Sequence, residues 1–189
     1  MFAKLSLAIA LASALAAGAP PTKREAAVFQ QKIDALKKEQ KKRRTIITEN
    51  ELNAYFIHES AKDLPVGVVN PQLTVIGPNR VSGRAVVDLD AVRKASPPTS
   101  LLDPKNFLIG RVPLSATAVF TSSNGMGKFA LESAKMGSLP LPKLLLDEVV
   151  SYYTRSESRP NGYTTESPFP LPIGIREIQI TPRQAVIIQ

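Results

Sequence analysis

The stretch Gly137–Arg155, GSLPLPKLLLDEVVSYYTR, contains two prolines and five leucines and predicts an abrupt change from strand to helix. Proline lacks a backbone donor, so Pro140 ends a strand, whereas Pro142 suits the first turn of a helix, where no donor is needed. Two explanations stay open for this helix: it is sunk in a curved sheet and contacted on two sides, or it borders an apolar cleft that admits a ligand. Its apolar residues cover about half of the circumference, namely Leu141, Leu145, Leu146, Val149, Val150, Tyr152 and Tyr153.

On both sides of this stretch the side chains alternate with the period of β-strands. Apolar residues recur at every second position over 73–89, around a Gly-Pro-Asn-Arg turn, and over 112–131, around Asn124-Gly125. Alternating runs joined by such turns are typical of β-hairpins. Residues 175–188 predict a third hairpin around Thr181-Pro182, and the proline-rich residues 95–109 predict a crossover between the first two.

Two further helices are expected before the strands. Thr48 and Glu51 have the spacing of a capping box and predict a helix that ends before Pro65, with Leu52 and Phe56 on its apolar face. Residues 23–44 predict a helix with a narrow apolar stripe and a basic end. Because a narrow stripe stabilises a helix mainly through what it docks on, we expect this segment to be dispensable for folding.

The order of these elements predicts an α+β fold, in which a strongly curved antiparallel sheet of three hairpins wraps on two helices behind an N-terminal helix. We expect one domain over residues 45–189, preceded by a basic amphipathic helix or tether over 20–44. Residues 155–172 lack periodicity and exceed the usual loop length, so they predict a mobile flap or a disordered excursion.

Residues 1–19 have the features of a secretory signal peptide. One early cation, Lys4, precedes an alanine-rich apolar run, and small residues at Ala17 and Ala19 suit cleavage. The apolar run is shorter than the roughly 20 residues that span a bilayer. We therefore expect an exported protein, periplasmic or extracellular, with anchoring in the inner membrane by an uncleaved signal as the alternative.

The net charge of +8 is unevenly distributed: residues 23–51 carry nine Lys or Arg against five Asp or Glu. A solvated helix end explains this basic run, and contact with an anionic membrane surface is the sharper alternative. Nucleic acid is not expected as a partner, because no aromatic residues interleave the basic run. The residues assigned to membrane contact are Lys37, Lys38, Lys41, Lys42, Arg43 and Arg44.

Residues able to do catalytic chemistry are scarce. The chain has no cysteine and one histidine, His58, which falls on the polar side of its helix. Asp88 and Asp90 share one face of a predicted strand, where a cation or an acid–base pair is possible but solvated charges are the plain expectation. Phosphate-binding and nucleophile motifs are missing. We expect no enzyme activity, no cofactor and no metal site.

Three segments in this order, ITENELNAYF, KFALESAKMGSLPLPKLLLDEVVSYY and FPLPIGIREIQIT, resemble small exported bacterial proteins of the YpmS-like and LmeA-like type. These are related by fold to tubular lipid-binding (TULIP) domains, and the resemblance covers residues 46–189. It implies a half-barrel with an apolar groove that binds a lipid or another amphiphile outside the cytoplasm. It carries Asn53 over only as a structural residue.

Three functions are therefore compared. We expect an amphiphile-binding domain first, a structural or adaptor module of the cell envelope second, and an unrecognised hydrolase third. The oligomeric state does not follow from the sequence. The residues expected to line the groove are Leu52, Phe56, Val75, Val87, Leu114, Phe129, Leu141, Leu145, Val149 and Tyr152.

Overall fold

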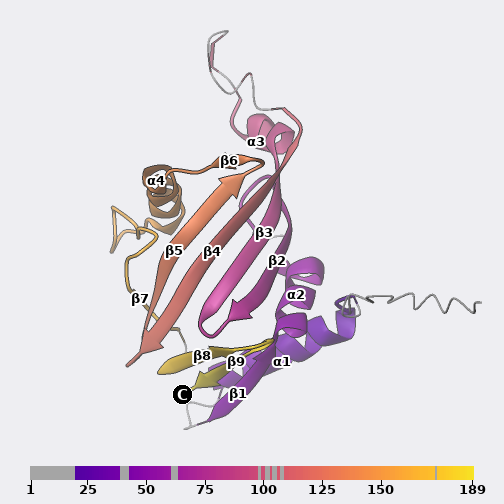
Figure 1. The fold of residues 1–189 in the computed structure, drawn as a ribbon, viewed down its shortest axis with the longest axis vertical. Coiled ribbons are helices and arrows are strands. Elements are labelled where there is room, and N and C mark those ends of the chain that lie inside the picture. Colours follow the sequence, from indigo (N-terminus) through magenta and orange to yellow (C-terminus); the bar gives the residue numbers. More distant parts are fainter. Residues whose placement is uncertain are drawn as a thin grey trace, which may run out of the picture.

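A computed structural model describes residues 20–38, 43–60, 64–97, 99–100, 103, 106, 109–172 and 174–189. Within these ranges the chain forms an α+β fold of four helices and two antiparallel sheets (Figure 1). The predicted class, α+β with antiparallel strands, is confirmed. The elements are α1 (Lys23–Lys38), β1 (Arg44–Thr48), α2 (Glu49–His58), β2 (Val68–Gly77), β3 (Arg80–Asp88), α3 (Leu89–Ala95), β4 (Arg111–Ser123), β5 (Met126–Met136), β6 (Leu139–Pro140), α4 (Lys143–Thr154), β7 (Phe169–Pro170), β8 (Glu177–Thr181) and β9 (Gln184–Ile188).

The larger sheet has the strand order β2-β3-β4-β5-β6, and β7 pairs with the other end of β5. Both predicted hairpins are present in it: β2 pairs with β3 and β4 with β5. Asn79, Asn124 and Gly125 have φ angles of 55°, 49° and 77°, the left-handed conformation that tight hairpin turns require. The sheet does not close into a barrel, because β2 and β6 lie at its two ends.

The smaller sheet has the order β1-β9-β8 and contains the predicted C-terminal hairpin. The expected single bent sheet is therefore wrong. The difference involves β1, for which no strand was predicted: Arg44 was assigned to the end of the basic helix or tether, and residues 45–48 to the start of the domain. The five residues of β1, RTIIT, are mostly β-branched, and Thr45 and Ile47 alternate with exposed neighbours, so the segment favours a strand that pairs with β9.

Helix α1 packs against the core and is not a detached tether. Ala26, Phe29 and Leu36 are buried, and the latter two contact Ile47 and Ile187 of the smaller sheet. This burial argues against the expectation that residues 23–44 are dispensable for folding, which stays a prediction. The apolar stripe is narrow, but its large members are almost fully removed from water.

The two later helices lie at opposite edges of the larger sheet, which does not wrap around them (Figure 1). Helix α2 contacts β2, and α4 lies beside β5 and β6. The Thr48–Glu51 capping box at the start of α2 is present as predicted. Helix α4 begins directly after Pro142, also as predicted.

The short helix α3 was not expected. Asp88 ends β3 and caps α3 by accepting a hydrogen bond from the Ala91 amide at 3.0 Å, and Asp90 lies in the first turn. The two carboxylates therefore do not share a strand face. Hydrogen bonds from Ala91 and Arg111 lower the pKa of Asp88, and Asp90 pairs with Arg93 at 3.0 Å. These contacts explain both acids as structural.

Candidate ligand-binding site

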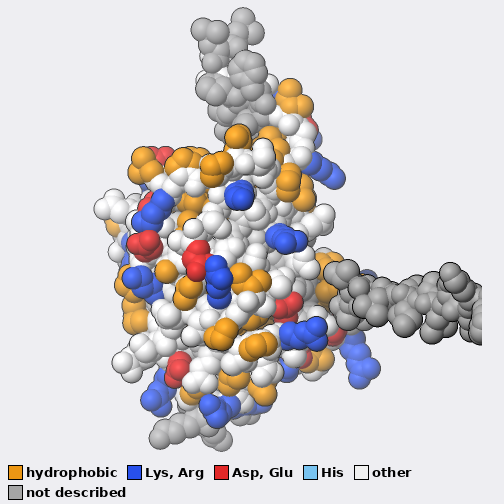
Figure 2. All heavy atoms as spheres, in the orientation of Figure 1, with side chains coloured by type: hydrophobic (Ala, Val, Ile, Leu, Met, Phe, Trp, Pro, Cys, Tyr) orange, Lys and Arg blue, Asp and Glu red, His pale blue; other side chains and the backbone are white. Residues whose placement is uncertain are grey.

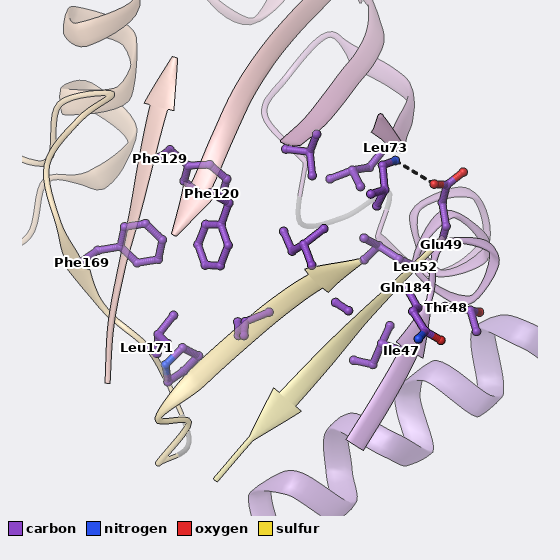
Figure 3. A pocket seen from close by; sticks show the side chains of 16 residues that line it. Ile47, Thr48, Glu49, Leu52, Leu73, Phe120, Phe129, Phe169, Leu171 and Gln184 are labelled. Atoms are coloured by element: carbon purple, nitrogen blue, oxygen red, sulfur yellow. Dashed lines mark hydrogen bonds between the residues drawn. The ribbon is translucent and has the colours of Figure 1, made fainter. Parts of the chain in front are cut away.

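A cavity of about 310 Å³ lies where the ends of β2–β5 face the smaller sheet (Figure 3). Its walls are apolar and come from both sheets, from α2 and from the segment that includes β7. The lining residues are Ile47, Thr48, Glu49, Leu52, Leu73, Val75, Val81, Phe120, Phe129, Phe169, Leu171, Pro172, Ile178, Ile180, Gln184 and Ala185.

Helix α2 is fixed to the edge of β2 by side-chain contacts with backbone groups. The Asn53 amide donates to the Leu73 carbonyl and accepts from the Leu73 N–H, both at 2.8 Å. Glu49 accepts from the Val75 N–H at 2.8 Å. These bonds satisfy the otherwise unpaired edge of β2 and hold Leu52 against the cavity.

The two sheets are joined on the other side of the cavity. The Ser122 hydroxyl, on β4, donates to the Ile178 carbonyl at 3.0 Å and accepts from the Ile178 N–H at 2.7 Å. The Phe120 N–H donates to the Asn79 carbonyl at 2.7 Å, and the Asn79 N–H donates to the Ile180 carbonyl at 3.1 Å. The Ser122 hydroxyl and the Asn79 N–H thus join the two sheets, and among the described residues a cavity remains between them.

An aromatic cluster forms one end of this cavity (Figure 3). Phe129 and Phe169 are stacked at 5.7 Å between ring centroids with 17° between the ring planes, and Phe120 lies 4.9 Å from Phe129. Despite these neighbours, Phe129 is 40% exposed. Because Phe129 also lines the cavity, part of this exposed surface is cavity wall that the described side chains leave uncovered.

A second apolar cavity, of about 490 Å³, lies beyond the same two rings. It is bounded by the larger sheet, by α4 and by the loop that follows α4. The residues that line it are Ala118, Phe129, Leu131, Val150, Thr154, Tyr163, Thr164, Thr165, Ser167, Phe169 and Pro170. Phe129 and Phe169 are the two residues that the linings of both cavities share.

Hydrogen bonds join three residues of the 155–172 segment, Asn161, Tyr163 and Thr165, to α4, and this part of the segment covers the second cavity. The Thr165 N–H and hydroxyl donate to the Asp147 carboxylate at 2.7 and 2.6 Å, and these bonds lower the pKa of Asp147. The Tyr163 N–H donates to the Thr154 hydroxyl at 2.7 Å, and the Ser151 hydroxyl donates to the Asn161 carbonyl at 2.6 Å.

A polar cavity of about 710 Å³ adjoins the first cavity at the end away from the aromatic cluster. Thr48, Glu49 and Gln184 line both cavities, and Figure 3 shows them opposite the phenylalanines. The remaining lining is polar or charged apart from one proline: Pro21, Glu25, Asn50, Glu51, Asn53, Gln72 and Arg183. An apolar space and a polar space therefore meet at one rim.

Of the ten residues expected to line one groove, three line the cavity between the sheets: Leu52, Val75 and Phe129. Val87 and Leu114 lie farther along the larger sheet, paired with Val112 and Ala85. Phe56 lies on α2 beside the Tyr55 ring, and Leu141 follows β6, where its N–H donates to the Ala134 carbonyl.

The three residues expected from α4 lie on its exposed face. Leu145, Val149 and Tyr152 are 46%, 48% and 66% exposed, whereas Val150 and Thr154 face the second cavity. The structure therefore does not bring the ten residues into one groove. The wall opposite the larger sheet comes from β8, β9 and residues 169–172, none of which was predicted to line the groove.

For residues 169–172, the sequence signal was the apolar pair Phe169 and Leu171 near the end of a mostly polar segment.

The expected membrane-contact residues are divided by the limits of the described chain. Lys37 and Lys38 end α1, with Lys37 3.9 Å from Asp34, and Arg43 and Arg44 are exposed at the start of β1. Lys41 and Lys42 lie outside the described residues, as does the expected signal peptide over 1–19. None of the helices in the described ranges combines the length and apolar character that crossing a bilayer requires.

The acidic and histidine side chains were compared with the arrangements that bind metal ions. No three acidic or histidine side chains in the described part of the chain are arranged to hold a metal ion. His58 Nε2 lies 3.2 Å from the Pro21 carbonyl oxygen, a contact between α2 and the start of α1. Comparison with protein-family models, with curated proteins and with solved structures finds no match for this chain.

Proposed function

We propose that this protein binds an amphiphile, with the apolar chain of the ligand in the cavity between the sheets and its polar end at the rim formed by Thr48, Glu49 and Gln184. The observation that carries the proposal is the exposed surface of Phe129, which faces an apolar cavity from inside an aromatic cluster. Protein interiors are normally packed to the density of organic crystals, so an unfilled apolar space of this size favours an apolar ligand.

The adjoining polar cavity distinguishes an amphiphile from a wholly apolar ligand. A polar head needs hydrogen-bonding partners, and Asn50, Gln72 and Arg183 supply them beyond the shared rim. Each buried methylene contributes about 0.8 kcal/mol before the costs of association. A chain of about eight buried methylenes therefore contributes roughly 6 kcal/mol to binding.

The first experiment asks whether the purified protein binds an apolar probe and carries lipid. The uncharged fluorophore N-phenyl-1-naphthylamine is titrated into the protein, and organic extracts are analysed by mass spectrometry. We expect saturable probe binding in the micromolar range. Protein that is lipid-free and binds neither the probe nor a monoacylglycerol would contradict the proposal.

A matched pair of variants locates the site. Ala185→Phe places a ring in the cavity, whereas Ala130→Phe places the same ring on the exposed outer face of β5. We expect Ala185→Phe to weaken probe binding at least tenfold and Ala130→Phe to leave it unchanged, with both variants folded by circular dichroism. Equal effects of the two substitutions would show that the probe binds elsewhere.

The adaptor function is the second candidate, because hydrophobic side chains gather over α4 and β6 on the surface shown in Figure 2. Leu139 and Leu144 there are 70% and 73% exposed. Apolar patches of this kind mark interaction sites. A protein partner on this face predicts that Leu144→Asp abolishes co-purification of that partner while probe binding is retained.

The proposed setting is outside the inner membrane, after cleavage near Ala17 or Pro20, with the basic residues at the end of α1 as contacts to an anionic surface. The likeness to YpmS-like, LmeA-like and TULIP proteins belongs to the same proposal. It is supported by the capped α2, the paired hairpins and the helix after Pro142. N-terminal sequencing from the native host tests cleavage: an intact Met1 in the membrane fraction would favour the anchored form.

A further inference from the structure

We propose that the second cavity is a continuation of the ligand site, and that Phe169 is the internal gate between the two, so that the protein selects its ligand by chain length. This inference rests on the proposed function and adds the chemical class of the ligand: an amphiphile with one long unbranched chain. Its basis is that two apolar cavities of about 310 and 490 Å³ meet at the Phe129–Phe169 stack.

The three spaces follow one another in a row, which favours one chain over two. The polar cavity meets the first apolar cavity at Thr48, Glu49 and Gln184, and the aromatic cluster closes the opposite end (Figure 3). The second cavity begins behind that cluster. A chain that stays between the sheets, with its head at the polar rim, therefore meets the stacked rings before it reaches the second cavity.

The position of Phe169 is set by its backbone and by a glycine. Phe169 pairs with Gly127 on β5, and the Leu171 N–H donates to the Gly125 carbonyl at 2.7 Å. A Cβ at residue 127 would lie 3.0 Å from the Phe169 ring, so the glycine gives the ring room to approach the sheet. The ring thus lies between the two cavities, whose linings it shares.

The segment that carries Phe169 can move the ring without disturbing the sheet. β7 has two residues and pairs with one end of β5, whereas Asn161, Tyr163 and Thr165 of the same segment bond to α4. Tyr163, in the same loop, contacts Phe169 edge-on, with 6.4 Å between the two ring centroids. A rotation of the Phe169 side chain would join the cavities, and no charged side chain lines the second one.

The test measures how affinity depends on chain length. Saturated monoacylglycerols from octanoyl to stearoyl are titrated against bound N-phenyl-1-naphthylamine, and its displacement gives their affinities. The assay compares the wild type with two variants. Ala118→Phe places a ring in the second cavity but not in the first, and Ala130→Phe carries the same ring on the outer face of β5. In the wild type we expect affinity to rise by about fourfold per methylene, the equivalent of about 0.8 kcal/mol, until both cavities are filled.

Ala118→Phe should weaken binding of the long chains at least tenfold and leave the octanoyl compound within twofold of the wild type. Phe169→Ala should raise the ratio of long-chain to short-chain affinity, because the gate is removed. Leu131→Trp replaces Ala118→Phe if the latter does not fold, since Leu131 also lines the second cavity alone.

The outcomes separate the two proposals. If no monoacylglycerol binds the wild type, the proposed function fails. If the compounds bind but Ala118→Phe and Ala130→Phe give the same chain-length profile as the wild type, the proposed function stands and the continuation into the second cavity is refuted.

Discussion

Asn53 offers the sharpest test of how α2 is held on the larger sheet. Its side chain is 4% exposed and makes two hydrogen bonds of 2.8 Å to the backbone of Leu73, one as donor and one as acceptor. Asn53→Ala leaves a buried N–H and a buried carbonyl without these partners. At about 1.5 kcal/mol for each group, the free energy of unfolding should fall by about 3 kcal/mol.

The melting temperature should fall by roughly 6–12 °C, because about 1 kcal/mol corresponds to about 2–4 °C in a chain of this size. Thermal unfolding followed by circular dichroism measures it. Asn50→Ala is the control: the same residue type, on the same helix, but exposed. It should change stability by less than about 0.5 kcal/mol.

A second variant tests the direction of the bonds. Asn53→Asp keeps the size of the side chain and the acceptor for the Leu73 N–H, but at neutral pH it sets a carboxylate oxygen against the Leu73 carbonyl. It should therefore be destabilised as well. The reasoning would be refuted if Asn53→Ala melted within 2 °C of Asn50→Ala, about the effect of 1 kcal/mol or less, or if Asn53→Asp matched the wild type.

Two further predictions concern the core and the cover of the second cavity. Leu36→Ala, at a fully buried position of α1, should lower the free energy of unfolding by about 2–5 kcal/mol, measured by urea denaturation. Leu144→Ala, at a position 73% exposed, should lower it by less than about 0.5 kcal/mol. Equal effects of the two substitutions would show that α1 is a tether and not part of the core. The lowered pKa of Asp147 means that its bonds to the loop stabilise the native state above the ordinary aspartate pKa of about 3.9 and are lost as pH falls through the lower native value. Hydrogen exchange over residues 155–172, corrected for intrinsic rates, should therefore become faster below about pH 4 in the wild type. In Asp147→Asn it should already be fast at neutral pH. A pH-independent profile that is identical in both proteins would contradict this role of Asp147.

Local sequence signals were sufficient for elements whose structure depends on neighbouring residues. The capping box of α2, the Asn124-Gly125 hairpin turn and the proline switch into α4 were all predicted at their positions. In each case a side chain or a constrained φ angle satisfies or removes a backbone group within four residues. Such interactions act in the same way in any fold.

The sequence also indicated which residues are apolar, but only the tertiary structure decided which of them face each other. The apolar half of α4 pointed to a groove, yet Leu145 and Val149 are exposed and the cavity wall comes from β8, β9 and Phe169. Likewise, the pairing of β1 with β9 joins residues more than 130 positions apart and divides the strands into two sheets. Pairing over such separations depends on the register and packing of whole strands, and no periodicity within one segment encodes it. The sequence by itself therefore determined most of the elements and their order, whereas only the tertiary structure shows the bonds that join the two sheets, between the Ser122 hydroxyl and the Ile178 backbone and from the Asn79 N–H to the Ile180 carbonyl.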